Sequence, residues 1–327
     1  MKWLPILAAL VALLSPLSSH AHEVRPAYLD LSEDRPGEFS VLWKTPMVGE
    51  MRLALDPAFS DPVEALTPVA GRRTGDAAVQ TWRLRADSLR GQTLRIKGLE
   101  GTLTDVLVRV SFADGSIWVE RLTPQRPEAM IPAHPSAWSV AGTYLGLGVE
   151  HILMGIDHLV FVLTLLLLTT GTWRLVKTVT AFTVAHSITL GLATLGVVHV
   201  PPKPVEAMIA LSIVFVAAET LHARRGQTGL AARMPWIVAF TFGLLHGFGF
   251  AGALSEVGLP EGQIPVALLF FNLGVEAGQL LFIAGLLALL AITKRIRVTW
   301  PAWAELVPPY AIGSVAMFWV IQRVTLF

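Results

Sequence analysis

Charged residues are distributed unevenly along this chain, and that distribution constrains its fold more than any other feature. Residues 22–137 contain 14 Lys/Arg and 16 Asp/Glu, whereas the longer stretch 138–327 contains only 10 Lys/Arg and 8 Asp/Glu. Long apolar stretches with so few charges are typical of helices that cross a lipid bilayer. The sequence therefore predicts a water-soluble domain followed by an α-helical membrane bundle.

Composition excludes several classes of protein. Hydrophobic residues make up 53% of the 327 residues and charged residues 15%, which argues against an entirely soluble protein and against intrinsic disorder. A formal net charge of +1 gives no indication of a nucleic-acid partner. The absence of cysteine excludes disulfides, thiolate metal ligands and a cysteine nucleophile. The chain also lacks a G-x-x-x-x-G-K-[ST] sequence, so no ATP site of that type is expected.

The N-terminus has the pattern of a secretory signal peptide. Lys2 precedes a short apolar run, and Ser19 and Ala21 supply small residues before a cleavage point. We predict a signal peptide over residues 1–21, with an uncleaved anchor as the alternative. Cleavage would make His22 the first residue, whose α-amine and imidazole can chelate a metal together; a solvated terminal histidine is the alternative interpretation.

Residues 22–123 are predicted to form an extracytoplasmic all-β domain resembling a sandwich. Asp114-Gly115 between two alternating runs is typical of a hairpin turn. Residues 124–137 contain four prolines and are expected to form a stiff linker. The alternating runs that predict strands are 28–31, 39–43, 51–55, 79–84, 93–96, 106–112 and 117–122.

Residues 138–327 are predicted to form about six transmembrane helices, at 140–168, 175–198, 205–222, 236–254, 264–292 and 306–326. The first and fifth exceed the minimum length, so they must tilt, kink or begin at the interface. The first, third and fifth loops carry eight Lys/Arg and the other two carry only Lys203. By the positive-inside rule, the β-domain and the C-terminus are then periplasmic, in a bacterial-type inner membrane.

The most informative residues are ionisable and polar groups within these apolar segments. Such groups are costly in lipid, and they usually face a cavity and a partner. His186, His246 and Glu276 each lie about 17 Å into their segments, near the middle of the bilayer. The principal candidates for handling a metal are His151, Asp157, His158, His186, His246 and Glu276, and the supporting candidates are Glu150, Ser187, Asn272 and Gln279.

Helix geometry separates the roles of these residues. On a straight helix His151 and His158 share a face but lie about 10 Å apart, so they are expected to form two stations along a path rather than one site. Asp157 is expected to orient a ligating histidine of a neighbouring helix. Histidine and carboxylate ligands without thiolate suit divalent Ni, Co, Zn, Fe or Mn and argue against a Cu(I) relay.

Several motifs together resemble the HupE/UreJ family of membrane proteins. Residues 148–158 (GVEHILMGIDH) are similar to its H-x5-D-H signature, and residues 22–28 (HEVRPAY) resemble the mature start of its longer members. Further similar stretches are HSITL at 186–190, FGLLHGFGFAG at 242–252 and FNLGVEAGQ at 271–279. The resemblance implies a nickel or cobalt permease linked to hydrogenase or urease maturation, with His151, Asp157 and His158 as the metal-handling motif.

Three functions are compatible with the sequence. The leading hypothesis is a secondary transporter for a divalent transition metal, with the ion as substrate and the bilayer as its surroundings. An intramembrane zinc hydrolase with Glu276 as general base is the alternative from another class. A membrane platform whose β-domain docks a partner is the third, with the polar residues serving helix association.

Overall fold

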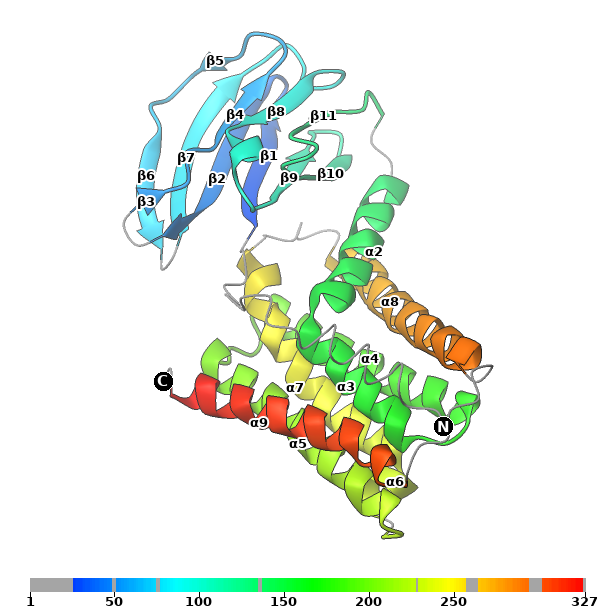
Figure 1. Cartoon of the computed structure of the whole chain (residues 1–327). Coiled ribbons are helices and arrows are strands. Elements are labelled where there is room, and N and C mark those ends of the chain that lie inside the picture. The colour runs from blue at the N-terminus through cyan, green and yellow to red at the C-terminus, as the bar shows by residue number, and fades with distance from the viewer. Residues whose placement is uncertain are drawn as a thin grey trace. The chain divides into compact units, whose positions relative to one another are not determined.

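The structure is a computed structural model of the protein. It describes residues 26–48, 51–74, 77–134, 137–227, 229–256, 264–293 and 302–325. They form a β-sheet unit and a helical unit, and the chain passes from one to the other between Thr143 and Tyr144 (Figure 1). The predicted signal peptide and His22 lie outside the described residues.

The β-sheet unit consists of two sheets. The larger has the strand order β10-β9-β1-β2-β7-β5, with β3 paired to β2 and β6 paired to β7; β1 and β9 are parallel. Its strands are β1 (Ala27–Arg35), β2 (Glu38–Val48), β3 (Met51–Arg52), β5 (Glu64–Ala65), β6 (Ala70–Thr74), β7 (Ala77–Arg85), β9 (Val106–Ser111) and β10 (Ile117–Leu122). The smaller has the order β11-β8-β4, from β4 (Asp56–Phe59), β8 (Thr93–Lys97) and β11 (Glu128–Met130).

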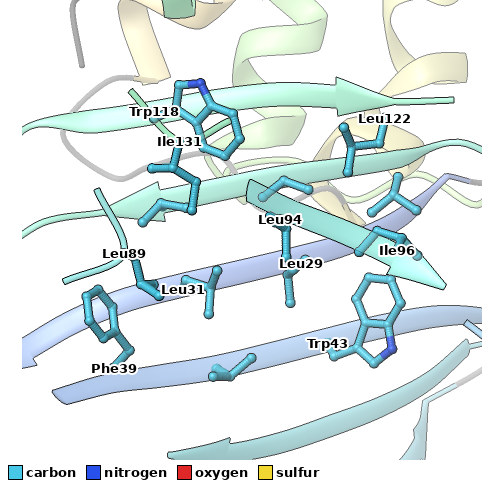
Figure 2. Packing of buried hydrophobic residues seen from close by; sticks show 14 of the residues in the cluster. Leu29, Leu31, Phe39, Trp43, Leu89, Leu94, Ile96, Trp118, Leu122 and Ile131 are labelled. Atoms are coloured by element: carbon cyan, nitrogen blue, oxygen red, sulfur yellow. The ribbon is translucent and has the colours of Figure 1, made fainter. Parts of the chain in front are cut away.

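The two sheets enclose one hydrophobic core. Leu29 and Leu31 alternate along β1 and pack with Leu94 and Ile96 of β8, and all four side chains are fully buried (Figure 2). Trp43 fills one end of this core, and its indole N–H donates to the carbonyl of Leu55 at 3.2 Å, so its polar atom is satisfied. The all-β, sandwich-like domain predicted from alternation is confirmed.

Local features of this unit follow from turn chemistry. Gly115 adopts a positive φ of 81° and Asp114 Oδ1 accepts from the Ser116 N–H, so the predicted hairpin between β9 and β10 is present. Part of the predicted linker belongs to a sheet instead, because Glu128–Met130 forms β11 and pairs with β8.

The helical unit contains the long apolar helices that the sequence predicts. They are α2 (Ala137–Met154, from Tyr144 onward), α3 (Ile156–Leu168), α4 (Thr172–Thr194), α5 (Pro202–Arg224), α7 (Pro235–Glu256), α8 (Ile264–Thr293) and α9 (Val307–Val324). Short helical turns lie at α6 (Leu230–Arg233) and η2 (Ala302–Glu305).

Four or five of the predicted spans are supported within the described part of the chain. Segments in α4, α5, α8 and η2–α9 are long and apolar enough to cross a membrane. The pair α2 and α3, bent by 73°, counts as a fifth if it is one span, which fits the kink expected of an overlong first segment. Helix α7 qualifies only as a shorter apolar helix over Pro235–Gly249, so six spans remain a prediction.

Helices pack closely where a glycine faces a neighbouring backbone. Helix α9 lies along α5, and α4 lies against α8 (Figure 1). On α8, a Cβ added at Gly274 would overlap the carbonyl oxygen of Leu145 on α2, so α2 and α8 approach to a distance that only glycine permits. In lipid, where no hydrophobic force draws helices together, such close van der Waals packing stabilises the bundle.

We expect Gly274→Ala to lower the unfolding temperature of the purified protein in detergent. The added methyl group forces α2 and α8 apart, and overpacking of this kind costs about 1–3 kcal/mol. Gly285→Ala is the matched control, because that position on the same helix has nothing within 4 Å of an added Cβ. Thermal unfolding followed by circular dichroism measures both, and equal unfolding temperatures for the two variants would contradict the packing argument.

Candidate metal site

A break in the first membrane segment brings two histidines together. Helix α2 ends at Met154 and α3 begins at Ile156, with Gly155 between them and a bend of 73°. The ring centroids of His151 and His158 are 4.9 Å apart. The expectation of two separate stations is therefore wrong, because it assumed a straight helix and the chain bends between the two residues.

Glycine is required at this break. A Cβ added at Gly155 would lie 2.7 Å from Nδ1 of His158 and 2.9 Å from the carbonyl oxygen of His151. Any larger residue would displace the His158 ring or the end of α2. The absence of a side chain at Gly155 therefore permits both the bend and the position of the His158 imidazole.

Two more histidines complete the cluster. His186 of α4 joins His151 and His158 in a group whose ligand atoms all lie within 4.8 Å of one another. His246 of α7 packs against His158 with ring centroids 4.9 Å apart. His186 and His246 are fully buried and His158 is 8% exposed. We refer to His151, His158, His186 and His246 as the histidine cluster.

Close contact between α4 and α7 places His246 in the cluster. A Cβ at Gly247 would overlap the carbonyl oxygen of His186, so only glycine lets the two backbones approach at this level. Phe161 and Phe182 flank the His246 ring, with centroids 5.1 Å and 5.0 Å away. These aromatic walls keep the surroundings of the imidazole apolar.

Hydrogen bonds indicate the tautomer of His186. Its Nδ1 lies 3.2 Å from Oδ1 of Asn272, and the Asn272 amide nitrogen donates to the carbonyl of Leu268 at 2.8 Å, which fixes the amide orientation. Asn272 Oδ1 is an acceptor, so Nδ1 of His186 carries the proton and Nε2 keeps its lone pair. That Nε2 is buried and has no hydrogen-bond partner among the described residues.

The same reasoning applies to His246. The Ser212 hydroxyl of α5 donates to the carbonyl of Ile209 at 2.6 Å, so it can accept from Nε2 of His246 at 3.3 Å. Nδ1 of His246 then keeps the lone pair, and this buried atom also lacks a partner in the described part of the chain. Nε2 of His158 is buried and unpartnered in the same sense. Buried acceptors without hydrogen bonds are costly, and a bound metal ion would satisfy them.

Three polar side chains of α8, Asn272, Glu276 and Gln279, make separate contacts with α4. Asn272 contacts the cluster, whereas Glu276 Oε1 accepts from Thr180 at 2.6 Å and Gln279 Oε1 accepts from Thr183 at 3.0 Å. Thr180 is six residues before His186, about 9 Å along the helix axis. Glu276 therefore does not lie among the four imidazoles, and it contacts α4 about 9 Å along the helix axis from His186.

The remaining predicted residues lie in other contacts. Asp157 accepts from Arg323 of α9 at 2.7 Å, a partner that the sequence did not indicate. Ser187 donates to the carbonyl of Thr183 on its own helix at 2.7 Å, and Glu150 is half-buried on α2. The sequence also did not indicate that Ser212 orients His246, although a serine deep in an apolar segment was a usable signal.

Comparison with known proteins identifies the family. The family description "HupE / UreJ protein" matches residues 125–323. The chain belongs to the HupE/UreJ family. No curated protein and no solved structure matches the chain significantly.

The family match contains every residue of the candidate site. It begins just before β11 and extends into the last turn of α9, so it includes the whole histidine cluster, Asn272 and Arg323. Most of the β-sheet unit precedes the matched residues. The part of this HupE/UreJ protein that matches the family is therefore mainly the helical unit.

We expect Gly155→Ala to weaken Co²⁺ binding by about tenfold or more, because displacing a ligand costs at least as much affinity as losing a group that hydrogen-bonds to a ligand. Gly146→Ala is the matched control, since a Cβ at that position of α2 has nothing within 4 Å. Titration of Co²⁺ into each purified variant, followed by visible absorption, measures the affinity. Unchanged affinity in Gly155→Ala would show that the bend does not position a ligand.

Proposed function

We propose that this HupE/UreJ protein is a secondary transporter for a divalent transition metal, with the ion as its substrate. The observation that carries this proposal is the buried histidine cluster, built from four helices. Membership of the family agrees with a role related to metal transport.

The donor set narrows the substrate class. Neutral imidazole nitrogens suit Ni²⁺, Co²⁺ and Zn²⁺, whereas Ca²⁺ and Mg²⁺ require oxygen ligands. The chain has no cysteine, which disfavours soft Cu⁺. The family resemblance favours Ni²⁺ or Co²⁺ among these ions, and a maturation system for hydrogenase or urease is the proposed recipient.

The arrangement suits passage more than permanent binding. A divalent ion bound only by neutral imidazoles keeps its full charge, so the cluster should release it more readily than a site with carboxylate ligands. Asn272 contacts His186 of the cluster, and Glu276 and Gln279 contact Thr180 and Thr183, which precede His186 on α4. The side-chain oxygens of Glu276 and Gln279 offer the ion further ligands along α4. The proposed route enters beside His151 and His158 and continues between α4 and α8.

Charge placement supports an orientation for this route. Arg174 donates to the carbonyl of Ala232 at 2.9 Å, Arg224 pairs with Glu305 at 3.0 Å, and Arg225 donates to Tyr310 at 2.7 Å. These contacts join the predicted cytoplasmic loops at one end of the helical unit. We propose that this end faces the cytoplasm of a bacterial-type cell and that the β-domain and C-terminus are periplasmic.

His158→Ala is expected to reduce Ni²⁺ or Co²⁺ uptake into proteoliposomes by about tenfold or more, because it removes the imidazole that contacts both His151 and His246. His199→Ala is the control, since His199 is exposed between α4 and α5. Uptake that persists in His158→Ala would overturn the proposed transport site. Absent uptake together with one tightly held Zn²⁺ would favour the hydrolase, and lost stability with unchanged metal handling would favour the platform.

Orientation can be tested directly because the chain contains no cysteine. Asp61→Cys in the β-sheet unit and Gln227→Cys after α5 both introduce a thiol at an exposed position. A membrane-impermeant maleimide should label Asp61→Cys in intact spheroplasts and Gln227→Cys only after lysis. Labelling of Gln227→Cys in intact spheroplasts would reverse the proposed topology.

A further inference from the structure

Arg323, near the end of α9, connects three helices. One guanidinium nitrogen donates to Oδ2 of Asp157 on α3 at 2.7 Å, and another donates to the backbone carbonyl of Glu206 on α5 at 2.8 Å. The guanidinium also lies 6.0 Å from the ring centroid of Trp319, one turn earlier on its own helix. A single side chain therefore holds both α3 and α5 from α9.

This contact is stronger than an ordinary surface ion pair. The Arg323 and Asp157 side chains are only 19% and 22% exposed, so the pair is largely shielded from water. A charge-assisted hydrogen bond in such surroundings fixes geometry, and removal of one partner leaves the other charge partly buried and unpaired. The fork of the guanidinium allows both bonds at once, which a lysine ammonium does not reproduce with the same geometry.

The two bonded positions control residues of the histidine cluster. Asp157 lies in the first turn of α3 and directly precedes His158. Glu206 lies less than two turns before Ser212 on α5, and Ser212 contacts Nε2 of His246. The His158 and His246 rings are in turn 4.9 Å apart. Because Ser212 of α5 contacts His246 of α7, a shift of α3 relative to α5 would change the distance between two proposed ligands, His158 and His246.

We propose that Arg323 is a positioning residue for the metal site, which acts by holding α3 and α5 in register through Asp157 and the Glu206 carbonyl. This role rests on the proposed function of the histidine cluster. In this proposal the Asp157 carboxylate binds Arg323 of α9 rather than the metal ion. The carboxylate of the H-x5-D-H sequence therefore supports His158 indirectly. Ligand sets must be held to within about 0.5 Å, so loss of this connection should impair binding.

The test compares Co²⁺ binding by the purified full-length protein and its variants in detergent, through both affinity and visible ligand-field absorption. We expect Arg323→Gln to weaken Co²⁺ binding by about 10- to 100-fold and to change the absorption spectrum, as happens when a residue that positions metal ligands without touching the ion is lost. Arg323→Lys should give an intermediate affinity, because it keeps the charge and loses the fork. Arg225→Gln is the matched control: it removes an exposed arginine that joins α5 to Tyr310 near the other end of α9.

Each outcome decides the matter. Wild-type affinity and spectrum in either Arg323→Gln or Arg323→Lys would overturn the positioning role, including the case in which only the unfolding temperature falls. Should Arg323→Gln fail to fold, Arg323→Lys alone gives the answer. An equal loss of affinity in Arg225→Gln would show a general packing effect and would also overturn it. A wild-type protein that binds no Co²⁺ would overturn the proposed function first, and the positioning role with it.

Discussion

The bend at Gly155 is the constraint on which the candidate site depends. On a continuous helix His151 and His158 would lie about 10 Å apart and could not share an ion. The bend costs little hydrogen bonding, because the Gly155 N–H still donates to the His151 carbonyl and the Leu159 N–H donates to the Gly155 carbonyl, both at 3.0 Å. The backbone therefore remains largely satisfied in lipid while two imidazoles come into contact.

Close helix packing then supplies the other two histidines and their orientation. Gly247 lets α7 approach α4, and the resulting contact brings His246 beside His158. Hydrogen bonds from neighbouring helices, through Asn272 and Ser212, direct the imidazole protons away and leave lone pairs buried. The ligands and the groups that orient them thus come from different helices, and each depends on the backbone distances that the glycines permit.

The sequence predicted the division into a β-domain and a membrane bundle, and it predicted the residue types of the site. Apolar runs and buried histidines are visible in one dimension, whereas the direction of a bend is not, since an isolated glycine is tolerated within a helix. Asp157 illustrates the same limit: adjacent residues on a helix point about 100° apart, so it faces Arg323 while His158 faces the cluster. Two-residue strands such as β3 and β5 are too short to show alternation.

Charge explains why the carboxylates lie where they do. A divalent ion among neutral imidazoles gains coordination without neutralisation, so an adjacent free carboxylate would deepen the site and slow release. Asp157, next to His158 in the chain, is instead neutralised by Arg323. Glu276 of α8 instead contacts Thr180 of α4, about 9 Å from His186 along that helix. In the proposed transporter its carboxylate would attract an ion that leaves the cluster. For the proposed transporter, a site of neutral histidines with a carboxylate beyond it suits an ion that must be bound and then released.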